Sequence, residues 1–494
     1  MGSDISNKPN YVLYLPGISL KLFNIFKCIL ITRIPRESGH EEQIVEYLKK
    51  FAADRGLECK TDQLGNVMIA KEASAGREDR PTIVLQGHTD MVCEKLAGSD
   101  FDFSKDPISY EIEDGWMIAR ETTLGADNGI GVATALAILD GDATEHPRIE
   151  CLFTVQEEIG LHGARAVQKD FITGRTLINL DDEDEGYFCI GCAGGMDTVG
   201  TFKYEVKPLR KGAVVTKFSI GGGIGGHSGD DIDKNRFCAV QQLARFVDGA
   251  MAMGADLCSI HAGNKRNAIA RDGEAVLAIP ARKESAVVYL FNEYAADLKA
   301  EFSISDPDLT FSAKPVAKWE KGAVDTRTAK NVIRTLLAMP HGVTAVSDAI
   351  PGLVRTSTNL ASVKMSAGKI MVDTMQRSSV NSERIFLSQR IAALFAMAGA
   401  EVAYSGGYPG WKPNPRSAIK DKCVEAYRKL FGREPVVRAI HAGLECGLFT
   451  EKFHDMDMIA FGPTLRGVHA PGEKMDLASL ARFYAVLLEV LKSV

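Results

Sequence analysis

The chain has 494 residues and a formal charge of −6, from 58 Lys and Arg against 64 Asp and Glu. Hydrophobic residues make up 45% of the chain and charged residues 25%, which is usual for a globular protein with a large core. This composition excludes a disordered chain, a collagen-like fibre and a disulfide-stapled miniprotein. The slight acidic excess argues against nucleic acid as the main partner, because duplex binders usually carry a basic surplus.

The N-terminal stretch from Tyr11 to Thr32 is apolar, but Pro16, Lys21 and Lys27 interrupt it. No run of about 18 uncharged apolar residues remains, so we expect an amphipathic helix over residues 20–30 instead of a membrane span or a signal peptide. The ten cysteines are sparse and stand mostly alone in apolar runs, which suits thiols in a reducing compartment. These features predict a cytoplasmic protein without a membrane partner.

From residue 40 to 195 the patterns of helix and strand alternate. Helical patterns span residues 41–55 and 129–139. Continuous apolar runs that end at turn residues predict strands buried on both faces. The predicted strands of this part are 67–70, 82–86, 149–155 and 177–180. Strands interleaved with helices predict an α/β architecture, with a mixed, mostly parallel sheet between helices on both faces.

After Gly194 and Gly195 the pattern changes to that of an α+β domain inserted into the first. Its predicted strands are 214–220, 275–279 and 369–375, and its predicted helices are 237–250 and 284–299. The helix 383–398 follows, and the last hundred residues return to helix and strand, with strands at 402–404 and 458–461 and helices at 419–430 and 477–492. We therefore predict one domain made of residues 1–194 and 391–494, interrupted by a second domain over 195–390.

The most informative feature is a scatter of His, Asp and Glu residues at the ends of predicted buried strands. His88 and Asp90 follow the strand 82–86 and share one side, because alternate residues of a strand face the same way. A histidine that binds a metal needs an acceptor for its second ring nitrogen, and a carboxylate two residues on can supply it. When such a pair stands alone, a surface turn is the better explanation.

Three further strand ends and one late loop carry residues of the same kinds. Asp127 lies among glycines just before a helix, where Asp is also a favoured N-cap. Glu157 and Glu158 follow a buried strand, so one can bind a metal while the other reaches a bound water; an acidic loop is the alternative. Asp181 ends the next strand in an acidic run that a solvated edge also explains, and His469 lies in a late loop.

Taken together, these positions favour one shared metal site over a separate structural explanation for each of them. Four of them lie at strand ends of one α/β layer, where open sheets place their ligands. Two imidazoles and three carboxylates, one of them shared, match two divalent cations about 3.5–4 Å apart. A ligand set without thiolate suits zinc, with manganese and cobalt as alternatives. The predicted ligands are His88, Asp127, Glu158, Asp181 and His469.

Four short motifs resemble those of the M20 family of co-catalytic metallopeptidases. They are HTD at 88–90, GADNG at 125–129, EEIG at 157–160 and NLD at 179–181. The segments 34–39, 191–195 and 441–447 resemble the aminoacyl-histidine dipeptidase branch of that family. The likeness runs from about Leu20 to the C-terminus and does not include the first 18 residues. The resemblance implies a two-domain M20-like fold in which the inserted α+β domain is a lid.

The resemblance also assigns roles to the predicted ligands. His88 and Asp181 would hold one metal, Glu158 and His469 the other, and Asp127 would bridge the two. 

Two acidic residues beside these ligands would complete the centre. Asp90 would orient His88, and Glu157 would act as general base. Two cations lower the pKa of a water between them, and Glu157 then takes its proton and delivers it to the leaving amine. We expect no covalent intermediate, because no Ser or Cys nucleophile is needed.

The inserted domain holds a glycine run that could be mistaken for a nucleotide site. Gly221, Gly223 and Gly226 satisfy G-x-G-x-x-G, but a dinucleotide fold needs a helix that opens directly from the last glycine. His227 and Ser228 follow instead. The resemblance implies that His227 is the lid histidine that donates a hydrogen bond to the tetrahedral oxyanion; a glycine-rich turn is the alternative.

Free dipeptides carry a terminal carboxylate, which the fork of an arginine side chain suits. Arg377, at the end of a predicted strand, matches the lid arginine of the family. Asn267, His441 and Glu445 are further candidates for substrate binding, each with a structural role as an equal alternative.

The resemblance therefore implies a metal-dependent hydrolase of unblocked dipeptides, above all Xaa-His dipeptides such as β-Ala-His, with a small peptide as its partner. A tripeptidase or an N-acyl amino acid amidohydrolase of the same family is the nearest alternative. A non-catalytic peptide-binding relative and an NAD-binding oxidoreductase are more distant ones. Lid domains of the family often pair two protomers, so the resemblance also allows a homodimer, although no segment marks a pairing surface.

Overall fold

The computed structural model describes residues 30–141 and 145–494, and the chain divides into two compact units. Unit 1 consists of the residues up to Gly191 together with Pro413–Ala439 and Glu445–Val494. Unit 2 consists of Cys192–Lys412 and Ile440–Leu444. The helix expected over residues 20–30 lies outside the described residues, except for its last residue. In the two described ranges, no helix is both long enough and apolar enough to cross a membrane.

Unit 1 is built on an eight-stranded sheet in the order β1-β2-β6-β3-β7-β21-β8-β20. The bounds of these strands are β1 Glu58–Thr61, β2 Val67–Lys71, β3 Ile83–His88, β6 Ile149–Thr154, β7 Thr176–Asn179, β8 Tyr187–Cys192, β20 Val436–Ile440 and β21 Asp457–Ala460. Strand β3 pairs in parallel with β6 and β7, and β7 with β21, whereas β1, β2 and β6 pair antiparallel. A small sheet of β4 Glu111–Glu113, β5 Trp116–Ile118, β22 Leu465–Arg466 and β23 Lys474–Asp476 completes the unit.

The central strands of this sheet bring several chain segments to one edge. All six residues of β3 and all six of β6 are buried, as expected for strands covered on both faces. In the parallel register, His88 lies opposite Thr154, and Gln86 lies opposite Asn179. The residues that follow β3, β6 and β7 therefore leave the sheet at the same end.

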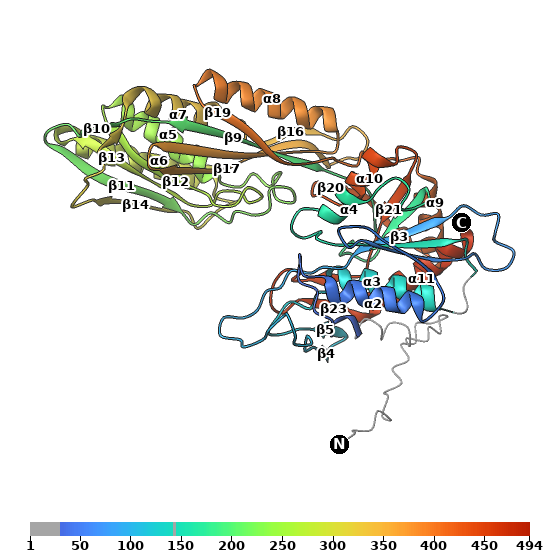
Figure 1. The fold of residues 1–494 in the computed structure, drawn as a ribbon. Coiled ribbons are helices and arrows are strands. Elements are labelled where there is room, and N and C mark those ends of the chain that lie inside the picture. Colours follow the sequence, from blue (N-terminus) through green and yellow to red (C-terminus); the bar gives the residue numbers. More distant parts are fainter. Residues whose placement is uncertain (1–29, 142–144) are drawn as a thin grey trace. The chain divides into compact units, whose positions relative to one another are not determined.

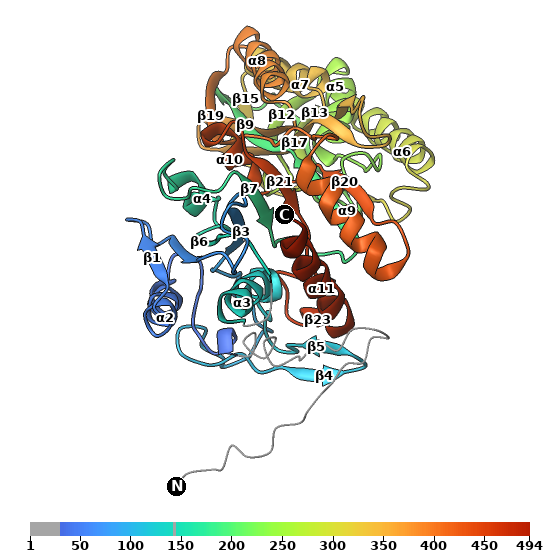
Figure 2. The ribbon, with the colours of Figure 1, turned by 90° about the vertical axis from the view of Figure 1, so that its right-hand side faces the viewer.

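Helices cover both faces of the sheet of unit 1. Figures 1 and 2 show α2 and α3 on one side of β3 and α4 and α10 on the other. The helices are α2 Glu42–Ala53, α3 Ala126–Asp140, α4 His162–Ala166, α9 Ala418–Phe431, α10 Cys446–Lys452 and α11 Leu477–Ser493. Helix α3 is apolar all round and almost wholly buried, so it can pack closely against β3. Helix α9 begins at the N-cap Ser417, whose hydroxyl accepts from the Lys420 N–H, and ends at Gly432 in the left-handed region.

Unit 2 is an antiparallel sheet with helices packed against it. The strand order is β14-β11-β13-β12-β17-β18-β9-β19, with β16 paired to β17. The strands are β9 Gly194–Lys203, β11 Ala213–Gly221, β12 Asp256–Ala262, β13 Gly273–Pro280, β14 Thr310–Pro315, β16 Gly342–Val346, β17 Val354–Ser366, β18 Lys369–Ser378 and β19 Glu401–Tyr408, and a separate pair is formed by β10 Val206–Lys207 and β15 Ala323–Val324. The helices are α5 Ala239–Ala252, α6 Glu284–Glu301, α7 Thr326–Ala338 and α8 Asn381–Met397, and η2 Ala281–Lys283 is a short 3-10 turn.

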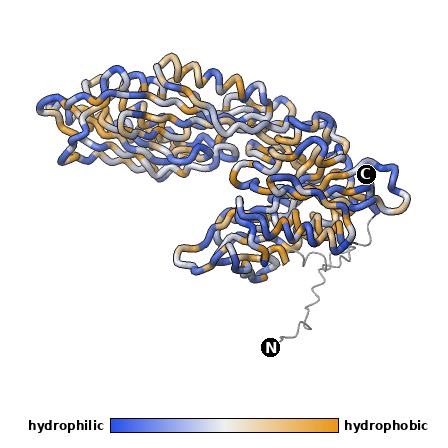
Figure 3. The backbone as a smooth tube through the Cα atoms, viewed as in Figure 1, coloured by the Kyte–Doolittle hydropathy of each residue, from blue (hydrophilic) through white to orange (hydrophobic). Residues whose placement is uncertain are grey.

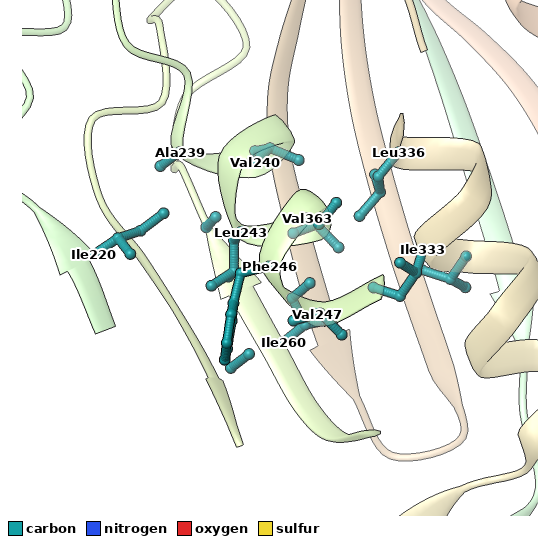
Figure 4. Close-up of a cluster of buried hydrophobic side chains, with 14 of the residues drawn as sticks. Ile220, Ala239, Val240, Leu243, Phe246, Val247, Ile260, Ile333, Leu336 and Val363 are labelled. Carbon is teal, nitrogen blue, oxygen red and sulfur yellow. The ribbon is translucent and has the colours of Figure 1, made fainter. Parts of the chain in front are cut away.

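The core of unit 2 lies between its sheet and helices α5 to α8. Figure 4 shows Leu243 and Val247 of α5 beside Ile260 of β12, Val363 of β17 and Ile333 of α7, all of them fully buried. In Figure 3 the hydrophobic stretches of each unit alternate with hydrophilic loops. Burial of these apolar faces is the main favourable term in folding each unit.

Two features of unit 2 bear on the predictions. Helix α5 starts at Ala239, well after Gly226, so the glycine run does not open into a helix. Strand β19 pairs with β9, so that unit 2 extends to Lys412 instead of ending near residue 390. The division into residues 1–194, 195–390 and 391–494 remains a prediction. Its second limit, residue 390, lies before Lys412, where the structural unit ends, because of the β9–β19 pairing.

Candidate active site

Three of the predicted metal ligands meet at the end of β3. The His88 side chain is 1% exposed, and its Nε2 atom lies 3.1 Å from Asp127 Oδ1 and 3.5 Å from Asp181 Oδ1. One ligand atom from each of these three residues lies within 4.8 Å of the others, a grouping that could hold a metal ion.

A second group shares Asp127 with the first. The other carboxylate oxygen of Asp127, Oδ2, lies 3.1 Å from His469 Nε2, and this nitrogen is also 2.9 Å from Glu158 Oε1. His469 has a positive φ of 62°, which is unusual for a residue other than glycine. Asp127 thus presents one oxygen to each histidine, which is the arrangement expected of a carboxylate that bridges two metals.

Asp90 lies behind His88 and is fully buried. His88 Nδ1 is 3.1 Å from the Asp90 carbonyl oxygen and 3.5 Å from its carboxylate. The carboxylate also accepts hydrogen bonds from the Glu157 N–H, the Glu158 N–H and the Ser38 hydroxyl, at 3.0, 3.1 and 2.7 Å. Burial would raise the pKa of Asp90, but the hydrogen bond and charge of His88 and the Glu157 N–H lower it to about 2. Asp90 therefore stays ionised and connects the β3 loop to the loop after β6.

Glu157 carries a carboxyl group in strongly negative surroundings. Burial raises the pKa of Glu157 well above its usual value, and the charges of Glu158 and Asp181 raise it further, against the opposing effect of His88. Hydrogen bonds that the His469 ring donates to the carboxylates of Asp127 and Glu158 raise the pKa of His469 to about 11. The carboxylates of this cluster outnumber its two imidazoles, so the cluster carries an excess of negative charge. Its oxygen and imidazole donors, grouped in threes around one shared carboxylate, therefore fit two divalent cations.

The loop that carries Asp127 is held by a residue that the sequence predictions omit. Glu473 is 1% exposed, and its carboxylate accepts hydrogen bonds from the backbone N–H groups of four successive residues. These are Leu124 at 2.7 Å, Gly125 at 2.9 Å, Ala126 at 2.8 Å and Asp127 at 3.4 Å. Because Glu473 also follows His469 by four positions, it ties the two loops of the second group together.

Arg36 is a second omitted residue of this kind. The side chain is 2% exposed and donates to the carbonyl oxygens of Thr89 and Asp90 at 3.0 and 3.2 Å and to that of Gly125 at 2.5 Å. Burial lowers the pKa of Arg36, although Glu473 acts in the opposite direction. The segment 34–39 and the loop 467–473 both stand out in the sequence, but no local pattern reveals that these two side chains point inward.

Asn128 explains why small residues surround Asp127. Its Nδ2 atom donates to the Leu180 carbonyl oxygen at 2.7 Å, next to Asp181. A Cβ atom on Gly87 would lie 2.3 Å from Asn128 Oδ1, and one on Gly131 would lie 2.2 Å from it. Glycine at both positions lets the three strand ends approach one another.

Glu445, predicted to bind substrate, has interior partners instead. Its carboxylate is fully buried, and Oε2 accepts hydrogen bonds from Gln86 Nε2 at 2.5 Å and Thr154 Oγ1 at 2.8 Å. Asn179 Nδ2 donates in turn to Gln86 Oε1 at 2.7 Å. Each strand that leads to the metal ligands thus contributes one polar side chain to this network. These contacts favour the structural alternative for Glu445, support of the strand ends, and a contact with substrate stays a prediction.

Two of the predicted substrate-binding residues of unit 2, Arg377 and His227, lie in contact at the end of β18. The Arg377 side chain is 3% exposed and donates from Nε to Ser228 Oγ at 3.2 Å and from Nη1 to Tyr408 Oη at 3.0 Å. Its Nη2 atom lies 3.2 Å from His227 Nε2. His227 Nδ1 lies 3.0 Å from Asp230 Oδ2. Tyr408 and Asp230 are additions that the sequence motifs do not single out.

His441 and Asn267 lie in unit 2 as well, with different surroundings. His441 is 6% exposed, and its Nε2 atom lies 2.7 Å from Ser357 Oγ. Burial, followed by the charge of Arg377, lowers the pKa of His441 to about 3. Asn267 has an exposed side chain, and its carbonyl oxygen accepts from the Ser228 N–H at 2.9 Å. Their roles in substrate binding remain predictions.

Known proteins similar to this chain agree with the motifs. Residues 84–493 match the peptidase family M20/M25/M40. The cytosol non-specific dipeptidase of Escherichia coli is 38% identical over 465 residues, which cover 94% of this chain and 96% of that protein.

Solved structures give the same result. The aminoacylhistidine dipeptidase of Vibrio alginolyticus has a TM-score of 0.87 and 36% identity, with 95% of this chain and 96% of that one covered. A tripeptidase of Staphylococcus aureus, at 16% identity and a TM-score of 0.55 over 95% and 97% of the two chains, shares the fold alone. The predicted α/β fold and the predicted resemblance are confirmed: the chain belongs to the peptidase family M20/M25/M40.

Proposed function

We propose that the protein is a dinuclear metallo-dipeptidase that hydrolyses unblocked dipeptides. The observation that carries this proposal is the position of Asp127, whose two carboxylate oxygens lie 3.1 Å each from the Nε2 atoms of His88 and His469. Two three-residue ligand groups that share one carboxylate support a pair of cations. The dipeptidase names of the Escherichia coli relative and of the Vibrio alginolyticus structure support the substrate class.

In this proposal His88 and Asp181 hold one cation, Glu158 and His469 the other, and Asp127 both. When bound, the cations would polarise the scissile carbonyl and lower the pKa of an attacking water. We propose Zn²⁺ as the resident metal, because the donors are imidazole and carboxylate without thiolate, with Mn²⁺ and Co²⁺ as the alternatives.

Glu157 is the proposed general base. Its carboxylate would accept the proton of the attacking water and then deliver it to the leaving amine. The Glu157 N–H donates to Asp90, which fixes the backbone of this residue beside His88. Asp90 keeps the His88 ring in place through Nδ1, and so acts on the ligand and not on the substrate.

We propose that unit 2 supplies the groups that bind the rest of the substrate. Arg377 would take the terminal carboxylate, and His227 would donate to the oxyanion that forms during attack. Asn267 and His441 are further candidates for substrate contact. Because the Arg377 guanidinium is buried and donates to neutral groups, an anionic ligand would complete its surroundings.

The finer parts of the proposal are Xaa-His specificity, with β-Ala-His as a substrate, and a cytoplasmic location. The name of the Vibrio alginolyticus protein supports the first, and that of the Escherichia coli protein supports the second. A homodimer remains part of the proposal from the family resemblance alone. A tripeptidase or an N-acyl amino acid amidohydrolase is the competing assignment.

Hydrolysis of a substrate panel by the metal-loaded protein tests the proposal. We expect turnover of β-Ala-His, Gly-His and Leu-Leu, its loss on treatment with a chelator and its return with Zn²⁺. Turnover of an acetyl-amino acid or a tripeptide with no turnover of any dipeptide would contradict the assignment. Glu157→Gln should bind two metal ions as the wild type does and lose nearly all activity; full activity in this variant would refute the role of Glu157 as base.

A further inference from the structure

Arg377 and His227 face each other through atoms that fix the state of the histidine ring. A guanidinium has only donors, so the 3.2 Å contact from Arg377 Nη2 requires His227 Nε2 to be an acceptor without a hydrogen. The hydrogen of the neutral ring must then be on Nδ1, where it points to Asp230 Oδ2 at 3.0 Å. The backbone N–H groups of Gly229 and Asp230 also donate toward Nδ1, but at 3.4 Å, which is longer than the 3.0 Å contact between Nδ1 and Asp230 Oδ2. The neighbours thus assign a neutral ring with Nδ1–H.

In this form, His227 cannot donate the hydrogen bond to the oxyanion that the proposed function assigns to it. A hydrogen bond to an oxyanion must come from Nε2, which here is occupied by Arg377 and has no hydrogen. The His227 side chain is 34% exposed and can reach a ligand, whereas Arg377 is 3% exposed. A carboxylate therefore gains the guanidinium only when Arg377 turns toward it and away from His227.

We propose that Arg377 is a latch on His227, and that a substrate carboxylate releases it. Once the guanidinium turns to the carboxylate, Nε2 takes a proton from solvent, and the charged ring donates from Nε2 to the developing oxyanion while Nδ1–H stays on Asp230. The inference rests on the proposed function and predicts that a free C-terminus of the substrate raises kcat and not only affinity. Asp230 is in this view the positioning residue for His227.

The charged and titratable groups around His227 come from three segments of unit 2. Asp230 and Asp231 belong to its own loop, and Asp231 Oδ2 accepts from the His227 backbone N–H at 2.7 Å. Arg377 approaches from β18, and His441 interacts with His227 electrostatically from the segment 440–444. Of these groups, Arg377 is the one permanent cation in contact with the ring. Its departure leaves Asp230 and Asp231 as the charged groups that accept hydrogen bonds from His227.

The test compares β-Ala-His with its C-terminal amide, which lacks the carboxylate. In the wild type we expect kcat for the amide to be at least about tenfold lower. In Arg377→Met the latch is absent, so kcat for the amide should rise roughly fivefold above the wild-type value for the amide, the factor that one hydrogen bond typically contributes. The rise should vanish in the double variant with His227→Gln. Arg245→Met is the matched control, because Arg245 of α5 is exposed and pairs with Glu301 of α6 at 3.0 Å. It should change neither rate.

Nitrogen NMR of the protein without substrate tests whether Arg377 controls the protonation of His227. With ¹⁵N-labelled histidine, and the His227 signals assigned from His227→Gln, the share of doubly protonated His227 at pH 7 should be higher in Arg377→Met than in the wild type. Asp230→Asn keeps an acceptor but removes its charge; it should lower this share and reduce kcat for β-Ala-His roughly fivefold at unchanged KM.

Two results overturn the latch. They are an amide rate in Arg377→Met that is equal to or below that of the wild type, and an equal share of charged ring in both proteins. If the protein hydrolyses no dipeptide at all, the proposed function fails, and the nitrogen spectra still decide whether Arg377 controls the ring.

Discussion

The four hydrogen bonds to Glu473 make a strong prediction about how the bridging loop is held. Glu473→Gln keeps one acceptor oxygen and replaces the other with an NH₂ group, which faces backbone N–H groups that it cannot accept from. The bonds to one carboxylate oxygen, either those from Leu124 and Gly125 or those from Ala126 and Asp127, are then lost. Hydrogen bonds to charged groups contribute roughly 1.5–3 kcal/mol each, so we expect a loss of about 3 kcal/mol in the free energy of unfolding.

The same substitution should weaken metal binding, because Asp127 sits at the end of the loop that Glu473 holds. Outer partners of metal ligands typically change metal affinity by about 10- to 100-fold, and we expect a decrease in that range. Urea unfolding of the metal-free protein measures the first effect, and competition with a chelating dye measures the second. Burial raises the pKa of Glu473, but the backbone N–H groups oppose this and favour the carboxylate that the variant lacks.

Glu111→Gln is the control for this experiment. Glu111 lies on β4 of the adjoining small sheet with 63% of its side chain exposed and pairs with Arg120 at 2.7 Å. Exposed pairs of this kind contribute little, so stability and metal affinity should stay at wild-type values. If Glu473→Gln behaves like this control in both assays, Glu473 does not position Asp127, and the argument from the hydrogen bonds is wrong.

Three further outcomes follow from the structure. Asp127→Asn should abolish binding of both metal ions together in titration calorimetry, since Asp127 belongs to both ligand groups; retention of one full-affinity site would refute bridging. Glu445→Leu should destabilise the metal-free protein by about 3 kcal/mol in urea unfolding, because Gln86 and Thr154 lose a buried partner, whereas Glu445→Gln should cost less, and equal values would contradict the network. Burial and Arg377 lower the pKa of His441 to about 3, while an unfolded histidine titrates near 6.5. The unfolded state therefore binds the proton first as the pH falls, and His441 should lower the free energy of unfolding by about 2 kcal/mol between pH 7.5 and pH 5. An unchanged pH dependence of stability in His441→Gln would refute this.

The elements that the sequence predicted well are those whose burial is uniform. Strands β3 and β6 are continuous apolar runs, and their predicted and observed limits differ by a few residues at most. Helices with a clear start, such as α6 at Glu284 and α11 at Leu477, also begin where the pattern predicts. Strand β17 was not predicted, because its residues Val354–Ser366 are rich in Ser and Thr although most of them are buried. Its hydroxyls find partners inside the sheet, which no local pattern reveals.

Pairing between distant strands is the part of the fold that local patterns do not carry. Residues 402–404 read as a strand, but nothing in them indicates β9 as the partner. Most of β19 is exposed, as expected for an edge strand, so it lacks the apolar signal that would tie it to the sheet of either unit. The predicted domain limit near residue 390 was based on a change in the local sequence pattern. The pairing of β19 with β9 places the limit later in the chain.

The candidate site divides in the same way. Residues that would touch a metal or a substrate come after strand ends in short motifs, because the chemistry itself needs those residue types there, and this made His88, Asp127 and Glu158 recognisable. Residues that hold them, such as Glu473 and Arg36, satisfy backbone groups of distant loops. Arg36 lies 53 positions from Thr89 and 89 from Gly125, and Glu473 lies 349 positions from Leu124. A glutamate four positions after a histidine looks the same in sequence whether it is solvated or buried. Only the path of the chain distinguishes the two cases, and so the support of a site is harder to predict than its ligands.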